Sequence, residues 1–497
     1  MKKAILSIWA ITALGLIANA QWVQIGNDLD GDTAAELSGY SVSLNDDGSI
    51  VAIGAISNND NGSEAGQVRI YQDNGGNWAQ IGDGINGEDP LDKFGNAVSL
   101  SGNGNRVAIG AQYNNGINGS FSGHVRIHEY DGNVWTQVGN DIDGEAFADE
   151  SGVAVSISND GGIVAIGAWN NDGVNGANSG HVRVYMDSSG NWVQLGADID
   201  GTTFVGGSGD AVSLSSDGNT VAIGARAPGN SAGQVRIFNY ASNVWTQIGV
   251  DIDGEAGSDD SGCSVSLSDD GSIVAIGAFR NDGVNGPESG HVRVYENISS
   301  VWTQVGDDID GEDDGDKSGW SVSLSGDGNL VAIGAPYNGG NPFAAGHVRI
   351  YQNISSVWTQ VGTDIDGEAA SDHSGRAVSL SADGSVVAIG AYENDGNGMS
   401  AGHVRIYTTG SIGIPEMDPS GISVYPNPTT GLINVAVDAT EQNNTVNIYN
   451  TLGALIHTER LSAVSIYKFQ LPDTKGLYLI QMVTEKGEVL TARVTKE

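Results

Sequence analysis

The sequence predicts an all-β protein: a seven-bladed β-propeller whose last blade is completed by the first strand, followed by a small β-sandwich. Three observations support this fold class. A four-segment unit recurs seven times along the chain. The segments show the short apolar runs of strands and no helical periodicity. The first and last copies are incomplete in complementary ways.

Seven tryptophans mark the copies and lie 53–57 residues apart: Trp22, Trp78, Trp135, Trp192, Trp245, Trp302 and Trp358. In one copy, "SGCSVSLSDDGSIVAIGA" predicts two strands joined by a tight turn. A loop rich in Asn, Asp and Gly follows, and then "HVRVYE" and "VWTQVG" predict two further strands. Repeated four-stranded units favour a propeller, which leaves only short and protected sheet edges. We expect each tryptophan to pack against the neighbouring blade rather than stack on a ligand.

The two ends of the repeat region predict how the ring closes. The chain opens with a lone "WVQIG" (22–26), and the last copy stops at "HVRIY" (403–407) without its tryptophan strand. The first segment is therefore expected to form the outer strand of the last blade. An open stack of repeats would need capping units instead. In this ring, the Asn/Asp/Gly loops and the segments that follow each tryptophan should lie on one face, which we call the loop-rich face.

Residues 1–20 have the features of a secretory signal, and the alternative is a retained anchor helix. Two lysines precede a short apolar run, and small residues stand before Gln21, so we expect cleavage there. We then expect residues 21–407 to form the propeller, 408–418 a linker and 419–497 a separate domain. No segment after residue 20 is apolar for long enough to span a membrane.

Composition limits the partners. The formal net charge is −40, with 61 acidic and 21 basic residues, which disfavours binding to nucleic acid and anionic membranes. We expect a soluble monomer. With one cysteine, Cys263, no intrachain disulfide can form. Other copies carry Tyr40, Asn96, Val153, Trp320 or Arg376 at its position, so we interpret Cys263 as a tolerated free thiol rather than a nucleophile.

An acidic loop follows the tryptophan strand in each copy, and in five copies it has carboxylates at positions 1, 3, 5 and 9. Alternating carboxylates are typical of calcium loops, because this ion takes six to eight oxygen ligands. The candidate calcium ligands are Asp28, Asp30, Asp32 and Glu36; Asp141, Asp143, Glu145 and Asp149; Asp251, Asp253, Glu255 and Asp259; Asp308, Asp310, Glu312 and Asp316; and Asp364, Asp366, Glu368 and Asp372. Turn formation and pairing with arginine would explain the same residues.

Two basic residue types recur on the third strand of the unit. An arginine occupies one position in all seven copies, and we expect it to tie its blade to a nearby acidic loop: Arg69, Arg126, Arg183, Arg236, Arg293, Arg349 and Arg405. A histidine precedes it by two residues in five copies, at His124, His181, His291, His347 and His403. Gln67 and Gln234 replace it in the other two. This exchange favours a structural hydrogen bond over metal ligation or catalysis.

The segment "DKFGNAVSLSGNGNRVAIGAQYNNG" (92–116) resembles the FG-GAP repeat of integrin-α propellers. Phe94-Gly95 and Gly110-Ala111 match the residues that give the repeat its name, although later copies replace the phenylalanine with serine. The resemblance covers 21–407 and implies a seven-bladed propeller used in extracellular recognition. It departs at the family's calcium loop between the first two strands, where this chain has a bare hairpin. The family's ion sites therefore cannot be carried over.

The tail resembles the C-terminal sorting domain of the type IX secretion system of Bacteroidota. "YPNPTTG" (425–431), "GLY" (476–478) and the terminal Lys496 match its pattern. The resemblance implies passage across the outer membrane by way of the periplasm, contact with the secretion machinery, and release or attachment at the cell surface. An ordinary β-sandwich binding module is the alternative.

The sequence thus predicts a secreted or cell-surface recognition or adhesion scaffold that binds a glycan, protein or matrix ligand through the loop-rich face. The alternatives are a propeller enzyme, a hydrolase or lyase that acts on polysaccharide, and a passive component of a surface layer. No paired catalytic carboxylates, Ser-His-Asp set or Cys-His pair stands out, so we expect no enzymatic activity. Calcium is the one cofactor that the residues suggest.

Overall fold

The computed structural model describes residues 21–203, 206–226, 231–339 and 344–409, and seven strand-bearing segments of the tail between 422 and 496. The predicted leader 1–20 and residues 410–418 of the predicted linker lie outside the described residues. The described residues form strands and turns, which confirms the all-β class. In this part of the chain, no helix is long and apolar enough to cross a membrane.

Seven antiparallel sheets form the blades, each with four main strands in the order inner to outer and one short extra strand that pairs with the third. Blade 1 has β3 (Ser38–Leu44), β4 (Ile50–Ala55), β5 (Gln67–Asp73), β6 (Trp78–Gln80) and β7 (Ile85–Asn86); blade 2 has β8 (Val98–Leu100), β9 (Arg106–Ala111), β10 (His124–Tyr130), β11 (Trp135–Gln137) and β12 (Ile142–Asp143); blade 3 has β13 (Ala154–Ile157), β14 (Ile163–Ala168), β15 (His181–Asp187), β16 (Trp192–Gln194) and β17 (Ile199–Asp200).

The remaining blades repeat this plan. Blade 4 has β18 (Ser208–Leu214), β19 (Thr220–Ala225), β20 (Gln234–Ala241), β21 (Val244–Gln247) and β22 (Ile252–Asp253); blade 5 has β23 (Ser264–Leu267), β24 (Ile273–Ala278), β25 (His291–Ile298), β26 (Val301–Gln304) and β27 (Ile309–Asp310); blade 6 has β28 (Ser321–Leu324), β29 (Leu330–Ala335), β30 (His347–Ile354), β31 (Val357–Gln360) and β32 (Ile365–Asp366); blade 7 has β33 (Ala377–Leu380), β34 (Val386–Ala391), β35 (His403–Thr409), β1 (Trp22–Gln24) and β2 (Leu29–Asp30).

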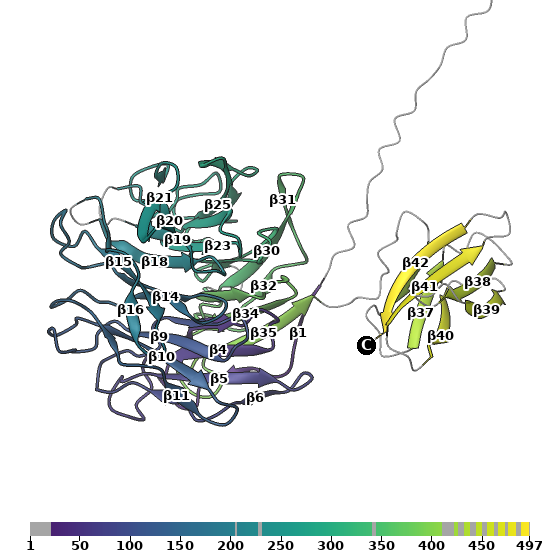
Figure 1. Ribbon diagram of the computed structural model, residues 1–497, viewed down its shortest axis with the longest axis horizontal. Coiled ribbons are helices and arrows are strands. Elements are labelled where there is room, and N and C mark those ends of the chain that lie inside the picture. The colour runs from purple at the N-terminus through teal and green to yellow at the C-terminus, as the bar shows by residue number, and fades with distance from the viewer. Residues whose placement is uncertain are drawn as a thin grey trace, which may run out of the picture. The chain divides into compact units, whose positions relative to one another are not determined.

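The first strand completes the last blade, as predicted. β1 pairs with β35 in antiparallel register, with Trp22 opposite Thr409 and Gln24 opposite Tyr407, and the two strands run side by side in Figure 1. β35 continues to Thr409, two residues beyond the predicted boundary at 407. The chain therefore closes a seven-bladed ring by pairing its first strand with its last repeat.

Hydrogen bonds run continuously around this ring at two levels. At the first, the tight turn after each inner strand donates a backbone N–H to the turn of the next blade, 2.7–3.0 Å away, through residues 46, 102, 159, 216, 269, 326 and 382 and back to 46. At the second, a serine hydroxyl in each inner strand accepts a backbone N–H from the next, as Ser43 does from Leu100 and Ser379 does from Leu44. Each blade is thus tied to both neighbours near the axis.

The tryptophans tie the blades at the periphery. The indole N–H of each of the seven donates to a backbone carbonyl of the preceding blade, as Trp22 does to Val361 at 3.1 Å and Trp78 to Ile25 at 3.2 Å. Between the blades lie apolar cores shared by two sheets; the core between blades 7 and 1, for example, joins Ile53 to Ile406. The predicted packing role of the tryptophans is confirmed.

Glycines allow adjacent blades to approach closely. In the "IGA" segment of the second strand, a Cβ on Gly224 would overlap the carbonyl oxygen of Gly262 in the next blade, and the same holds at all seven equivalent glycines. Gly262 itself has a φ of +88°, which side chains rarely adopt. The close packing of adjacent blades therefore requires the glycines of the recurring Ser-Gly and Ile-Gly-Ala segments.

The tail forms the predicted β-sandwich. One sheet has the order β36 (Ile422–Tyr425), β37 (Leu432–Val437), β40 (Ile466–Gln470), and the other has β39 (Leu455–Leu461), β38 (Asn444–Tyr449), β41 (Gly476–Val483), β42 (Val489–Lys496). Side chains of both sheets share a single buried core that includes Val435, Phe469, Val446 and Ile480. Residues 21–410 and the tail belong to separate compact units.

Replacing Trp22 with alanine tests ring closure. The indole is 7% exposed and bonds to blade 6, so its loss should lower the free energy of unfolding by about 3–5 kcal/mol. The measurement is chemical denaturation of the chain without its predicted leader. Val23→Ala, on the same strand but 49% exposed, is the matched control and should have little effect. Equal stability of the two variants would contradict closure through β1.

Candidate functional site

The loop-rich face holds the Asn/Asp/Gly loops and the acidic loops side by side, as predicted, and the structure adds that they bond to each other. The Asn/Asp/Gly loop of a blade donates from an asparagine side chain to the acidic loop that leaves the same blade. Asn175 bonds the carbonyl of Gly201 at 2.6 Å, and Asn285 bonds that of Gly311 at 2.7 Å. These contacts fix the acidic loops relative to the blades.

Within one acidic loop, the four predicted calcium ligands contact a glutamine, an arginine and the backbone of the loop itself. In the loop 141–149, Asp141 accepts from Gln137 at 2.6 Å, and the carbonyl of Asp143 accepts from Arg183 at 2.7 Å. The carboxylate of Glu145 lies 3.7 Å from Arg183, which belongs to the next blade. Asp149 is buried and accepts backbone N–H groups of its own loop. Arginine contacts and turn hydrogen bonds thus engage positions 3, 5 and 9, position 3 through its backbone carbonyl, and a glutamine engages position 1.

The other four loops repeat this arrangement with small changes. At position 1, Asp28, Asp251, Asp308 and Asp364 accept from a glutamine four residues earlier. At position 3, the carbonyls of Asp253, Asp310 and Asp366 accept from an arginine. At position 5, Asp32, Glu255, Glu312 and Glu368 face an arginine. At position 9, Glu36, Asp259, Asp316 and Asp372 accept from backbone N–H groups of their own loop.

The recurring arginines connect adjacent blades. All seven are 2–7% exposed. Arg183, for example, stands in blade 3 and bonds the loop that arrives from blade 2. Arg236 keeps its bond to the Asp200 carbonyl at 2.8 Å, although its loop has Thr202 where others have a carboxylate. The contacts that the predicted tie requires are therefore present in every blade.

Some His, Cys, Asp and Glu side chains of the described residues bring three or more ligand atoms within 4.8 Å of one another. Each such group combines one histidine with carboxylates of two different loops. None of these groups gathers three carboxylates from one loop. Calcium binding by the sets at positions 1, 3, 5 and 9 stays a prediction. The structure adds a different grouping, in which position 5 of one loop meets position 1 of the next.

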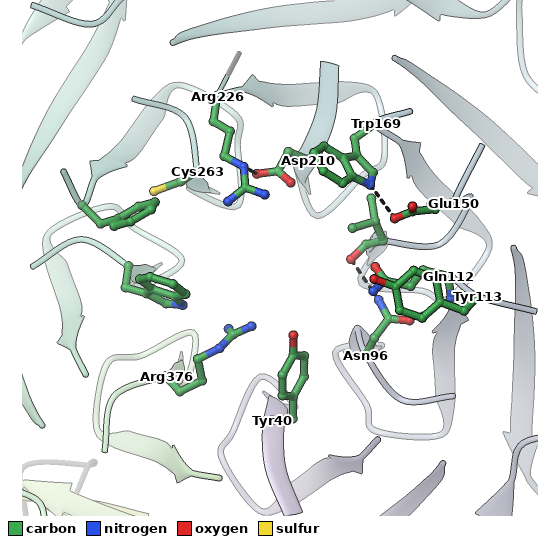
Figure 2. Close-up of a pocket in the computed structure, with 13 residues that line it drawn as sticks. Tyr40, Asn96, Gln112, Tyr113, Glu150, Trp169, Asp210, Arg226, Cys263 and Arg376 are labelled. Carbon is green, nitrogen blue, oxygen red and sulfur yellow. Dashed lines mark hydrogen bonds and ion pairs between the residues drawn. The ribbon is translucent and has the colours of Figure 1, made fainter. Parts of the chain in front are cut away.

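An axial pocket of about 350 Å³ opens on the loop-rich face (Figure 2). The residue that follows the Ser-Gly or Phe-Gly pair in each copy lies in its wall. These seven equivalent positions carry seven different side chains: Tyr40, Asn96, Val153, Asp210, Cys263, Trp320 and Arg376. The repeat symmetry that governs the rest of the ring is broken here.

Two arginines and two carboxylates line this pocket, and the guanidinium groups of the arginines point into the opening (Figure 2). Arg226 pairs with Asp210 at 3.1 Å. The guanidinium group of Arg376 has no hydrogen-bonding or ion-pair partner among the described residues; it lies over the ring of Tyr40, 4.3 Å from the centroid, and near Trp320. Burial raises the pKa of Asp210 to about 6, against the lowering effect of Arg226.

Aromatic rings and amides complete the wall. Phe279 and Trp320 contact each other with centroids 4.5 Å apart. On the opposite side, Trp169 donates its indole N–H to Glu150 at 2.9 Å, which holds both side chains in place. The amide of Asn96 also lines the cavity. Aromatic rings, guanidinium groups and amide groups thus line one concave pocket, as in sites for small ligands.

The sequence analysis missed this pocket because it treated variety at one repeat position as tolerance. Burial raises the pKa of Cys263 to about 12, so the thiol stays protonated and the interpretation of it as no nucleophile agrees with its surroundings. The variety itself was the signal. Equivalent residues at the start of the inner strands meet at the axis of the propeller. Seven different side chains at that position can therefore recognise one asymmetric ligand.

Comparison with known proteins identifies the tail. Residues 423–497 match the family model described as secretion system C-terminal sorting domain. The tail of this chain is therefore a type IX sorting domain, which implies that the chain interacts with that secretion machinery and is exported to the cell surface or beyond. No curated protein matches the chain.

Solved structures similar to the chain have low sequence identity. Hydrazine synthase of Kuenenia stuttgartiensis is 13% identical, with 74% of this chain and 94% of that chain covered at a TM-score of 0.47. The periplasmic gluconolactonase of Pseudomonas aeruginosa is 13% identical, with 82% and 95% covered at 0.45. A protein from Lactobacillus plantarum is 11% identical, with 88% and 96% covered at 0.46. No activity is transferred from these proteins.

Arg183→Met tests the tie between blades. It removes the bond to the Asp143 carbonyl and leaves Glu145 without its cation, so the free energy of unfolding should fall by about 1–3 kcal/mol. Thermal denaturation measures this loss. Arg460→Met is the control, because Arg460 is an exposed arginine on β39 of the tail. An unchanged melting temperature for Arg183→Met would contradict the tie.

Asp210→Asn tests the electrostatics of the pocket. Because the folded-state pKa of Asp210 is raised from 3.8 to about 6, the folded chain holds this proton more tightly than the unfolded chain. Asp210 therefore makes the protein less stable as pH rises from 4 to 6, by up to about 3 kcal/mol. Between these pH values, Asp210→Asn should lose less stability than the parent. Parallel pH profiles of unfolding free energy would show that the pKa is not raised.

Proposed function

We propose that the exported chain is a recognition protein whose axial pocket binds a carboxylate-bearing sugar unit of an extracellular glycan. The observation that supports this most is the convergence of seven different side chains, with two inward-pointing arginines, at the axis of an otherwise symmetric ring. One asymmetric ligand needs one asymmetric site. A ligand that bound the repeated loops would instead find seven similar sites around the ring.

The side chains of the pocket suit an acidic sugar. A guanidinium can donate two parallel hydrogen bonds to a carboxylate. No described residue accepts a hydrogen bond from the guanidinium of Arg376, so its donors can bind a ligand carboxylate. Trp320 and Phe279 offer apolar surface to the faces of a sugar ring. The hydroxyl of Tyr40 can bond to a sugar hydroxyl. A cavity of about 350 Å³ lies within the range of small-ligand sites, about 300–1,000 Å³.

A polysaccharide-acting enzyme is the second candidate, and the pKa of Asp210 favours it. A carboxyl group whose pKa is raised to about 6 can act as a general acid or base near neutral pH. Arg226 beside it could neutralise a substrate carboxylate. Incubation with uronate polymers, followed by assays for new reducing ends and unsaturated products, distinguishes the two functions: binding without turnover supports the recognition protein.

Several finer features of this proposal rest on the sequence alone. They are membership in the FG-GAP group of propellers, calcium binding in the acidic loops, passage through the periplasm with a cleaved leader, a monomeric state and a role in adhesion. The first two would place the chain among recognition propellers of the cell exterior, in keeping with its sorting domain.

Arg376→Gln tests the proposed function. It removes the pocket's unpaired cation, so affinity for galacturonate or glucuronate oligosaccharides should fall about 10–100-fold, while neutral oligosaccharides change little. Glycan-array screening of the leaderless chain followed by calorimetry measures this. Arg460→Gln, a change of an exposed arginine on β39 of the tail, is the control and should bind as the parent does. If neither acidic nor neutral glycans bind the parent, the proposal is wrong.

A further inference from the structure

We propose that blades 2, 3, 5, 6 and 7 each carry a binding site for a divalent d-block cation such as Zn²⁺. The ligands are the third-strand histidine of the blade, the glutamate at position 5 of the acidic loop that enters the blade, and the aspartate at position 1 of the loop that leaves it. The five groups are Glu88, His124 and Asp141; Glu145, His181 and Asp198; Glu255, His291 and Asp308; Glu312, His347 and Asp364; and Glu368, His403 and Asp28.

The ligand atoms already lie near the spacing that such an ion needs. In each group, one atom from each of the three residues lies within 4.8 Å of the others. The Nδ1 atom of His291 is 3.5 Å from Asp308, and that of His181 is 3.9 Å from Glu145. Ligands at about 2.1 Å from a tetrahedral zinc ion are about 3.4 Å apart. Closure by at most about 1.4 Å, from the 4.8 Å limit to this spacing, would complete the coordination.

Both carboxylates are oriented by residues outside the group. Gln137 bonds one oxygen of Asp141 at 2.6 Å, and the other oxygen faces His124 at 3.7 Å. Arg183 contacts one oxygen of Glu145, and the other faces His181. Partners that hold one oxygen and leave the second directed at the site are the outer-shell arrangement of metal centres.

The histidines have no other partner that explains their burial. Each of the five is 1–2% exposed. The Nε2 atoms of His124, His181 and His347 have no hydrogen-bonding partner among the described residues, and in His403 both ring nitrogens lack one. At these nitrogens of His124, His181, His347 and His403 the structural hydrogen bond expected from the sequence is missing. The carboxylates face Nδ1 in each ring, so the ligand atom would be Nδ1 and not the unpartnered Nε2. His403 Nδ1 is unpartnered and faces Asp28 at 3.8 Å, and a buried polar atom without a partner points to an ion or water.

The two blades without histidine lack the site in a consistent way. In blade 1, Gln67 bonds Asp60 and Asn86, and position 1 of the leaving loop is Gly84. In blade 4, Gln234 bonds Thr202, which replaces the glutamate at position 5 of the entering loop. A histidine thus occurs only where both of its carboxylates occur, and where one is missing the glutamine takes hydrogen bonds instead.

The donor set selects the class of metal. One imidazole and two carboxylates form three protein ligands, and a fourth position stays open for water or an external ligand. Calcium prefers six to eight oxygens and gains little from an imidazole, whereas imidazole suits zinc and its neighbours in the d block. Because the glutamate and the aspartate arrive on consecutive loops, each bound ion would also tie two adjacent blades.

Titration of chelator-treated, leaderless protein with Zn²⁺ tests the number of sites. We expect five ions per chain at micromolar affinity by calorimetry and native mass spectrometry, and Co²⁺ in place of Zn²⁺ should give absorption bands typical of low coordination. His181→Gln should bind four ions. This variant copies what blades 1 and 4 already contain, so it should fold, and circular dichroism of the metal-free protein checks that it does.

A gain of one site is the sharper result. Thr202→Glu combined with Gln234→His supplies blade 4 with the two missing ligands beside Asp251, and this double variant should bind six ions, whereas either single change should leave five. If the counts do not follow the histidines, or if Ca²⁺ binds and Zn²⁺ does not, the proposal is overturned. These results do not involve the axial pocket, so the two proposals fail independently.

Discussion

The structure depends on seven backbone hydrogen bonds that pass once around the axis, each from the first turn of one blade to the same turn of the next. A four-stranded sheet cannot bury its own two faces, and the second strand, for example Ile50–Ala55, is buried along its whole length. Each blade therefore needs a neighbour on either side. Only a closed ring gives every blade two neighbours, and closure requires the first strand of the chain to join the last sheet.

This closure decides where function can lie. Seven equal blades give seven equal environments on the periphery, so a residue that recurs there in every copy maintains the ring, as the tryptophans and arginines do. The axis is different, because equivalent residues meet there and act together as one site. The chain keeps its repeat strict around the ring and varies it at the axis, from Tyr40 through Asp210 to Arg376.

The sequence was sufficient for the fold because its signals are local and repeated. Turn residues, strand patterns and the split first copy determine blade number, strand order and closure without reference to distant contacts. The site was not predictable in the same way. Cys263 looked tolerant beside Tyr40 and Arg376 when the copies were aligned, yet the three face one cavity in space. In the same way, Glu145 and Asp198 lie on different loops, and their approach to His181 follows from blade packing rather than from spacing within one loop.

Charge then limits what the axial pocket accepts. A chain with a net charge of −40 repels polyanions over most of its surface, so an acidic glycan binds only where a cation has no carboxylate partner of its own. On the acidic loops that condition fails, since their arginines are buried and engaged by the loops themselves. At the axis two arginines meet two carboxylates, but Asp210 pairs with Arg226 and Glu150 accepts from Trp169 and Asn170. The guanidinium of Arg376 lies over the ring of Tyr40, without an ion pair among the described residues. A ligand carrying a single carboxylate beside an apolar face fits that residual charge, whereas a densely charged polymer must also approach the acidic rim.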